Sequence, residues 1–184
     1  MNFHYPDREI VGDAAPSVKP RATWMTMIGP GTRLTIMPLI VIGADTDAGE
    51  SILGRLERSQ SEREIRAFVT DEAKGLELKE RGFKVATGDV SDESHVEAAA
   101  LRCFSAVLVA EAAHDTRLRS FADSAEEVLQ GWARAVAGSQ VRRVIWVTDR
   151  EYPETAAPEV TSVDPSSPDL ADTVAALDDA QSIA

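Results

Sequence analysis

Between residues 38 and 148, short runs of mainly apolar residues alternate with segments in which apolar positions recur every three or four residues. The runs lie at 38–43, 64–70, 83–87, 105–110 and 141–148. Runs of this length are typical of strands buried on both faces of a parallel sheet. The segments between them are predicted to form helices at 48–59, 72–81, 92–103 and 119–138. The alternation favours an α/β fold, a doubly wound parallel sheet of about five strands in the order 3-2-1-4-5.

The periodic region is flanked by sequence of a different kind, so we expect one domain at 37–150. Residues 1–36 show no periodicity and are expected to be irregular. Because Met37 stands directly before the first strand, one hypothesis is that the natural product begins there; the alternative is an arm that packs on the domain. Residues 151–184 are rich in proline, serine and acids, which predicts a flexible acidic tail. Within it, Ser167 could begin a short helix that either docks or frays.

The loop after the first strand carries the most specific signal. Its sequence, Gly43-Ala-Asp-Thr-Asp-Ala-Gly49, joins an apolar strand to a segment of helical spacing. Glycine permits a sharp turn and the close approach of a ligand to the backbone, and a helix start offers free N–H groups and a positive dipole to a phosphate. The loop therefore indicates a nucleotide-binding strand-turn-helix unit.

The same loop carries acids where an anion would bind. Asp45, Asp47 and Glu50 oppose a pyrophosphate by Coulomb repulsion, which is about 1 kcal/mol per pair at roughly 4 Å in a water-like dielectric. Asp47 and Glu50 are also close to a capping box, in which both carboxylates satisfy free N–H groups at the helix start. Two interpretations of Asp45 and Asp47 remain open: a magnesium site, or carboxylates that cap a turn or face solvent.

Four segments of residues 37–149 together resemble the cofactor domain of atypical short-chain dehydrogenase/reductases, the NmrA-like NAD(P)H-binding (Rossmann) family. That family has G-A-T-G-x-x-G after strand one, and Thr46 replaces its middle glycine here. It has V-R-D after strand two and G-D-V after strand three, where this chain has Val69-Thr-Asp71 and Gly88-Asp-Val90. The fifth strand, Val141-Arg-Arg-Val-Ile-Trp-Val-Thr148, follows the family pattern V-x-x-x-V-x-x-S with threonine for serine.

The resemblance implies a dinucleotide site at the carboxyl edge of the sheet. It places the pyrophosphate against the first loop, at Gly43, Asp45, Thr46, Asp47, Ala48 and Gly49. Asp71, with Thr70 beside it, would face the adenosine ribose. Asp89 and Val90 would contact the adenine, and Ala110 would lie beneath the cofactor. Because Thr70 replaces an arginine of the family and Asp71 would repel a 2′-phosphate, NAD(H) is favoured over NADP(H) as the cofactor.

The catalytic pair of the full enzymes is missing from the sequence. Short-chain dehydrogenases use Tyr-x-x-x-Lys, in which the lysine lowers the pKa of the tyrosine. The tyrosines here are Tyr5 and Tyr152, Ala156 stands four residues after the second, and every lysine precedes the fourth strand. His114, followed by Asp115, is the best acid–base candidate because the fold would bring it to the substrate side. The alternative is an exposed loop histidine.

Charge and composition argue against several other classes. The 184 residues carry a formal net charge of −12, and 151–184 hold eight acids and no lysine or arginine. No basic patch is available for nucleic acid, and no run of 18 apolar residues marks a membrane span. The single cysteine, Cys103, allows no internal disulfide and is expected to be a buried apolar filler. We therefore expect a cytoplasmic protein.

Two classes of function remain. The first is a dinucleotide-binding protein, either a redox sensor or, if an enzyme, an NAD(P)-dependent oxidoreductase or an epimerase-like protein. The second is a degenerate module that has lost the cofactor and acts through protein contacts, as a homodimer or with a partner, through the 119–138 helix or the acidic tail. The segment 43–51 also resembles the phosphate loop of dethiobiotin synthetases, with Glu50 in place of the lysine, which adds a remote ATP-binding alternative.

Overall fold

The computed structural model describes residues 37–59 and 63–180, and the predictions for 1–36 lie outside the described residues. Six parallel strands form one sheet in the order β3-β2-β1-β4-β5-β6. The strands are β1 (Leu39–Ile42), β2 (Ile65–Val69), β3 (Lys84–Thr87), β4 (Ser105–Val109), β5 (Arg143–Val147) and β6 (Glu159–Val163). The predicted α/β fold and the order 3-2-1-4-5 are confirmed, and a sixth strand extends the sheet beside β5.

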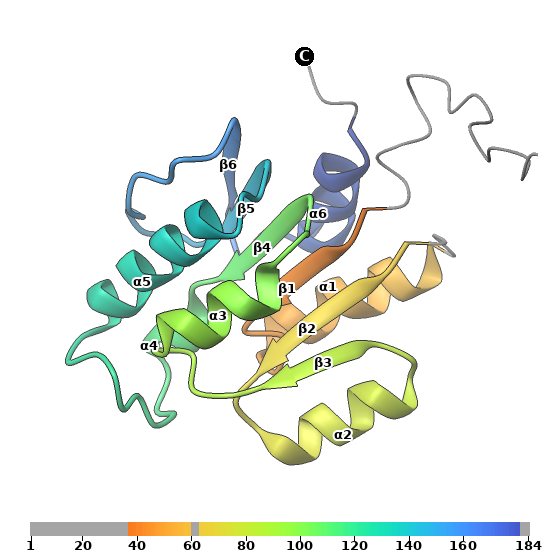
Figure 1. The fold of residues 1–184 in the computed structure, drawn as a ribbon. Helices are drawn as coiled ribbons and strands as arrows, with labels where there is room; N and C mark the ends of the chain where they lie inside the picture. The colour runs from red at the N-terminus through yellow and green to blue at the C-terminus, as the bar shows by residue number, and fades with distance from the viewer. Residues whose placement is uncertain (1–36, 60–62, 181–184) are drawn as a thin grey trace, which may run out of the picture.

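Helices cover both faces of this sheet. They are α1 (Asp47–Arg58), α2 (Glu72–Glu80), α3 (Glu93–Ala100), α4 (Glu111–His114), α5 (Ala125–Gly138) and α6 (Leu170–Asp179). The pair α3 and α5 lies on one face, and α1 and α6 lie side by side on the other (Figure 1). The protein is therefore a three-layer sandwich with the sheet in the middle.

The central strand β1 divides the core into two halves. Successive side chains of a strand point to opposite faces. Leu39 and Val41 pack in the half that α1 and α6 cover, while Ile40 and Ile42 pack in the half that α3 and α5 cover. All four side chains are fully buried, and each contributes roughly 1.5–3 kcal/mol of hydrophobic stabilisation. A strand buried on both faces has no polar positions, which explains its continuous apolar sequence.

The helix predicted at 119–138 begins later, at Ala125. Ser124 caps it, with its hydroxyl accepting the N–H of Glu127 at 3.2 Å. Residues 115–124 form a loop instead, and Phe121, which the helical pattern placed on the apolar stripe, is exposed. The prediction was wrong here because an N-cap serine stops the helix from extending towards the N-terminus, whatever the apolar spacing before it.

The helix predicted at 92–103 ends early, at Ala100. Arg102 adopts the left-handed backbone conformation, with φ of 65°, which ends a right-handed helix. Cys103 therefore lies in the turn before β4. Its thiol is buried, as expected, and burial raises its pKa to about 11, so the group is an inert apolar filler.

The prediction of a flexible tail over 151–184 is wrong for the described residues. Strand β6 pairs in parallel with β5 over its full length, and α6 packs against α1. The apolar face expected for a short helix is docked: Leu170 and Val174 are buried in the core, and Leu177 packs against it. The segment thus completes the sheet and covers one of its faces.

Buried polar contacts fix the end of α6. Arg143 is only 4% exposed; its Nε donates to Glu159 Oε2 at 2.7 Å and its Nη1 donates to the carbonyl of Asp178 at 2.6 Å. Arg63, just before β2, pairs with the carboxylate of Asp178. Acids that suggested a solvated tail are therefore used to bind two arginines of the domain.

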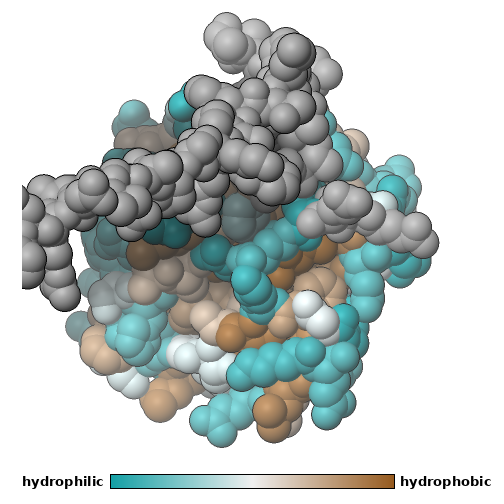
Figure 2. Space-filling view, turned by 45° about the vertical axis from the view of Figure 1, so that its right-hand side comes forward, coloured by the Kyte–Doolittle hydropathy of each residue, from teal (hydrophilic) through white to brown (hydrophobic). Residues whose placement is uncertain are grey.

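The outer surface of the described domain is mixed in character. On the face shown in Figure 2, hydrophilic and hydrophobic residues are interspersed. The longest helix within the described ranges, α5, has 14 residues. No helix in that part of the chain is long and apolar enough to cross a membrane.

We expect Val174→Ser to destabilise the protein by about 3 kcal/mol, because it leaves a cavity and buries a hydroxyl in the core. This should lower the melting temperature by roughly 6–12 °C. The matched control is Ala176→Ser on the exposed side of the same helix, which should change stability by less than about 0.5 kcal/mol. Equal melting temperatures for the two variants in differential scanning calorimetry would contradict the docking of α6.

Candidate functional site

The loops that follow β1, β2, β3 and β4 meet at the carboxyl edge of the sheet. The residues that we expected at the cofactor lie in these loops or in the first turn of α1, each within a few positions of the end of a strand. In open parallel sheets, ligands bind outside this edge, at the point where the strand order reverses. That point lies between β1 and β4 here. The fold therefore brings the predicted residues to one edge.

Two glycines shape the first loop. Gly43 has a φ of +78°, which favours glycine, and an added Cβ would lie 2.8 Å from Ala112 Cβ. A Cβ on Gly49 would lie 2.3 Å from the carbonyl oxygen of Gly43, so no larger residue fits between the loop and the start of α1. Both retained glycines are thus required by the turn itself, independently of any ligand.

Thr46 caps helix α1. Its hydroxyl donates to the carbonyl of Gly43 at 2.8 Å and accepts the N–H of Gly49 at 3.1 Å. The expected capping box of Asp47 and Glu50 is wrong, because Thr46 precedes Asp47 and already fills the capping position. One N–H that a phosphate could use is therefore taken by the Thr46 hydroxyl.

Two N–H groups remain available at this helix start. Within the described residues, the backbone N–H groups of Asp47 and Ala48 have no hydrogen-bond acceptor. Both residues line a cavity of about 370 Å³. The carboxylate of Glu50 is directed to the Lys74 ammonium of α2 at 2.5 Å, which offsets its charge. The helix start thus offers two donors and the positive end of its dipole to an anion.

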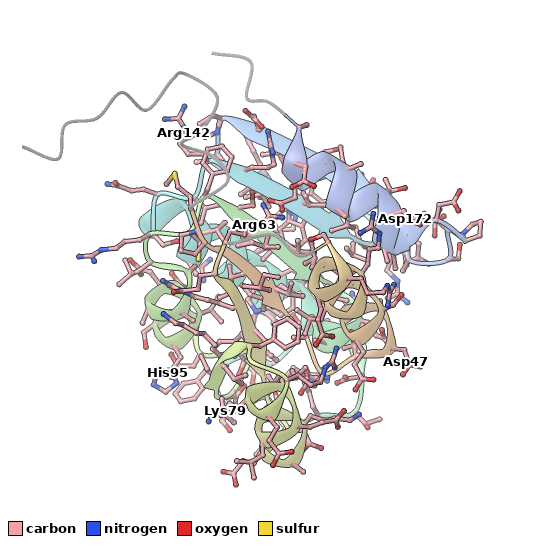
Figure 3. The ribbon with its side chains drawn as sticks, turned by 90° about the vertical axis from the view of Figure 1, so that its right-hand side faces the viewer. Asp47, Arg63, Lys79, His95, Arg142 and Asp172 are labelled. Carbon is pink, nitrogen blue, oxygen red and sulfur yellow. The ribbon has the colours of Figure 1, made fainter. Side chains whose placement is uncertain are left out.

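Acids surround the remaining space of this cavity. Asp47 and Asp172 lie on the same side of the molecule (Figure 3), and both line the cavity together with Glu111 and Asp169. Asp172 is paired with Arg55 of α1. Of the three acids expected to oppose a phosphate, Asp47 alone lines this cavity, and Asp169 and Asp172 come from the C-terminal segment.

Asp45 is turned away from the helix start. Its Oδ2 accepts the N–H groups of Thr70 at 2.8 Å and Asp71 at 3.0 Å, and its Oδ1 accepts Arg117 Nη1 at 2.9 Å. Burial alone would raise the pKa of this carboxyl, but the Asp71 N–H, the Arg117 guanidinium and the Thr70 N–H together lower it below the ordinary value. Asp45 is therefore a structural anion that ties the β1 loop to the end of β2.

Arg117 is the residue of this edge that sequence reasoning missed. It comes from the loop after α4, and its Nη1 also lies 3.2 Å from Thr70 Oγ1. Its Nη2 contacts the carboxylate of Asp115 at 2.7 Å. Asp115, expected beside a catalytic histidine, thus serves to hold Arg117. The signal for it in the sequence was an arginine two positions after Asp115. Such a pair has no place in a hydrophobic pattern, so periodicity does not detect it.

The other residues that we expected at the adenosine differ in where their side chains lie. Asp71 caps α2, with Oδ1 accepting the N–H of Ala73 at 2.7 Å, and it is exposed. Asp89 lies at the edge after β3. Val90 follows it in the chain, but its side chain is fully buried and its carbonyl accepts Trp132 Nε1 at 2.7 Å. The side chain of Val90 thus belongs to the core.

A second cavity, of about 240 Å³, lies where β4 and β5 end, above the buried Ala110. His114 lines it, but at the end of helix α4 and not in the expected loop. Its Nδ1 lies 3.3 Å from Arg150 Nη1, and its Nε2 is buried without a hydrogen-bond partner in the described part of the chain. Because a guanidinium can only donate, the contact with Arg150 favours the imidazole tautomer protonated at Nε2.

The two cavities are neighbours along the edge, since Glu111 and Pro165 line both. One lies at the N-terminus of α1 and the other at the ends of β4 and β5. No three histidine, cysteine, aspartate or glutamate side chains of the described residues are placed to hold a metal ion. The magnesium interpretation of Asp45 and Asp47 gains no support, because Asp45 already binds a guanidinium.

This architecture defines a Rossmann-type nucleotide-binding domain: a parallel sheet, a glycine turn into α1, and a cleft at the switch point. The family model described as NAD(P)H-binding matches residues 43–181, which is most of the chain. The protein belongs to this NAD(P)H-binding family. No curated protein matches the chain.

Solved structures with a similar fold include reductases. An NADPH-dependent quinone oxidoreductase from Escherichia coli, complexed with NADPH, aligns with a TM-score of 0.49 and 18% identity over 60% of this chain and 36% of its own. An anaerobillin reductase from Escherichia coli O157:H7 aligns with a TM-score of 0.47 and 21% identity, over 60% of this chain and 50% of its own. The Citrobacter sp. triphenylmethane reductase aligns with a TM-score of 0.48 and 15% identity, over 60% of this chain and 36% of its own. This chain thus aligns with half or less of each of these proteins.

We expect Asp45→Asn to lower the free energy of unfolding by about 1–3 kcal/mol at neutral pH, because it removes a buried charged acceptor. Folding lowers the pKa of Asp45 below 3.8, so its carboxylate stabilises the folded state above that pH, and this contribution is lost as the pH falls through the folded pKa. The difference from wild type should therefore shrink in acid. Urea unfolding at a series of pH values measures it, with the exposed Asp123→Asn as control. If the difference in unfolding free energy between wild type and Asp45→Asn stays constant with pH, the stabilising role of the Asp45 carboxylate is contradicted.

Proposed function

We propose that this protein is an NAD(H)-binding module of the NmrA-like type, which binds or senses the dinucleotide without the Tyr–Lys catalysis of short-chain dehydrogenases. Two neighbouring cavities at the carboxyl edge carry this proposal. One holds the N–H groups at the start of α1, the other lies beside His114 where β4 and β5 end, and both are lined by Glu111 and Pro165. A dinucleotide is a ligand of this kind, with an anionic centre and a ring at each end.

The start of α1 suits the pyrophosphate. The free N–H groups of Asp47 and Ala48 and the helix dipole supply the attraction. The tight contact between Gly49 and Gly43 keeps the loop close to the helix, so that the backbone is accessible. The acids of the cleft weaken this attraction, and the Lys74 contact with Glu50 offsets part of the repulsion.

The end of β2 favours NAD(H). Asp71 lies 22 positions beyond Gly49, which is the usual spacing for an acid that binds the ribose hydroxyls of NAD. Only its Oδ1 is used in capping α2. The other oxygen is therefore available to a hydroxyl, while a 2′-phosphate at the same place would be repelled.

The region beside His114 lacks the usual catalytic pair. Tyr152 stacks on Trp146, with ring centroids 5.5 Å apart, and no lysine follows it. The lysines of the described residues lie on α2 and β3, on the opposite side of β1 from His114. These observations support a binding or sensing role over a classical dehydrogenase.

A second candidate is a degenerate module that acts through protein contacts. The acid-lined cavity favours it, because Asp47, Glu111, Asp169 and Asp172 oppose any polyphosphate. Under this alternative, α5 or α6 would form the interface, and the partner would be a second copy of the chain or another protein.

Thermal unfolding of the full chain with NAD⁺, NADH, NADP⁺ or NADPH tests the proposed function. We expect NAD(H) at 100 times its dissociation constant to stabilise the fold by about 2.7 kcal/mol, which raises the melting temperature by roughly 5–11 °C. NADP(H) should give a smaller shift. If all four dinucleotides, each at millimolar concentration, leave the melting temperature unchanged, the second candidate is favoured.

Thr46→Gly restores the family's glycine, and we expect it to raise the affinity for NADH about tenfold, the equivalent of one additional hydrogen bond to a phosphate. The variant frees the Gly49 N–H and removes the Cβ, while glycine at an N-cap costs only a few tenths of a kcal/mol. Thr46→Ala is the matched variant, since it frees the same N–H but keeps the Cβ, and its gain should be smaller. Isothermal titration calorimetry measures both affinities. Weaker binding by Thr46→Gly would contradict the placement of the pyrophosphate.

A further inference from the structure

Residues 115–121, between α4 and α5, cross the carboxyl edge of the sheet from the end of β4 to the end of β3 (Figure 1). We call this segment the strap. We propose that the strap fills the adenosine half of the dinucleotide site and that a dinucleotide binds only when the strap is released. This inference rests on the proposed function and adds a regulatory element to the same site.

The first anchor of the strap is Asp89, the residue expected at the adenine. Its Oδ2 accepts the N–H of Ser120 at 2.7 Å, and its Oδ1 accepts the N–H and the hydroxyl of Ser91 at 2.8 and 2.6 Å. The hydroxyl of Ser91 in turn accepts the N–H of Phe121 at 3.0 Å. Both oxygens of Asp89 are therefore engaged within the protein, and the strap uses Oδ2.

The second anchor is Arg117, at the end of β2. Its guanidinium contacts Asp45 and the Thr70 hydroxyl, beside the place where Asp71 would meet the ribose. Its side chain is 12% exposed, so it fills space at this edge and does not lie free in solvent. Asp45, Thr70 and Asp89, three residues expected to contact the dinucleotide, are thus all bound by the strap.

The strap is attached by polar contacts and not by a hydrophobic core. Its large apolar side chain Leu118 is 76% exposed, and Phe121 at its end is 66% exposed. A segment with few buried apolar contacts opens at a low free-energy cost relative to global unfolding. The strap can therefore leave the edge while the sheet and helix α5 stay folded.

Release of the strap would exchange one set of partners for another. The hydrogen bonds that Asp89 and Thr70 lose with Ser120 and Arg117 can be replaced by polar groups of the adenosine. Asp45 loses the Arg117 guanidinium but keeps the N–H groups of Thr70 and Asp71. Because only the released state is competent, the apparent dissociation constant equals the intrinsic one divided by the released fraction. Any change that frees the strap should therefore tighten binding without a new contact.

Arg117→Gln removes the second anchor and tests this inference. We expect it to raise the affinity of the full chain for NADH roughly tenfold, if about a tenth of the wild type is released. Arg134→Gln is the matched control, because it removes an arginine–carboxylate contact, with Glu93, outside the strap. Its affinity for NADH should equal that of the wild type.

Hydrogen exchange gives a second readout that does not depend on activity. In the free protein the N–H groups of Ser120 and Phe121 should be protected, and saturating NADH should make them exchange faster, the reverse of the usual effect of a ligand. ADP-ribose, which carries the adenosine half, should do the same. Nicotinamide mononucleotide, which lacks it, should leave both N–H groups protected. In Arg117→Gln they should exchange faster without any ligand.

The outcomes separate the strap from the proposed function. Binding of NADH with equal affinity by wild type and Arg117→Gln, with Ser120 and Phe121 still protected in the complex, would overturn the strap inference and leave the proposed function standing. Binding by Arg117→Gln alone would support both. If neither protein binds any dinucleotide even with the strap released, both are overturned.

Discussion

The buried carboxylate of Asp45 is the contact on which the geometry of the site depends. A charge in this position costs several kcal/mol unless it is paired and hydrogen-bonded, and it is satisfied by two N–H groups after β2 and by Arg117. In the structure, this one carboxylate therefore joins the loop after β1, the end of β2 and the loop after α4. An acid that looked like an obstacle to a phosphate faces away from the start of α1 and holds three segments together.

The sequence was sufficient for the parts of the fold that depend on local pattern. The strand at Leu39–Ile42 is buried on both faces, so its apolar run identified it without ambiguity. The parallel direction of the strands followed from the alternation of strands and helices, and 3-2-1-4-5 is the usual strand order of a sheet that binds dinucleotides. Elements of this kind are determined by residues close together in the chain, which is why five strands and their order were predicted correctly.

The errors at the C-terminal segment and at Arg117 share one physical cause, which is that the partners of these residues are distant in sequence. The C-terminal segment looked solvated because its acids outnumber its apolar residues, yet Arg143 and Arg63 bind Glu159 and Asp178 in the fold. Arg117 and Asp45 are 72 positions apart. Helical caps were missed for a different, local reason, since Thr46 and Ser124 compete with neighbours whose side chains could also cap. The glycine turn was recognised, whereas the polar contacts around it were not.

The charge of the cleft is lower than the count of acids suggests. Asp45 is neutralised by Arg117, Glu50 faces Lys74, and Asp172 is paired with Arg55. The acids without such a contact in the described residues at the start of α1 are Asp47, Glu111 and Asp169. Their repulsion acts through solvent and is screened by salt within a Debye length of about 8–10 Å. The donors of Asp47 and Ala48 act at hydrogen-bond distance, where screening is weak. Binding of an anion therefore depends more on whether these N–H groups and the adenosine edge are accessible than on the net charge of the protein.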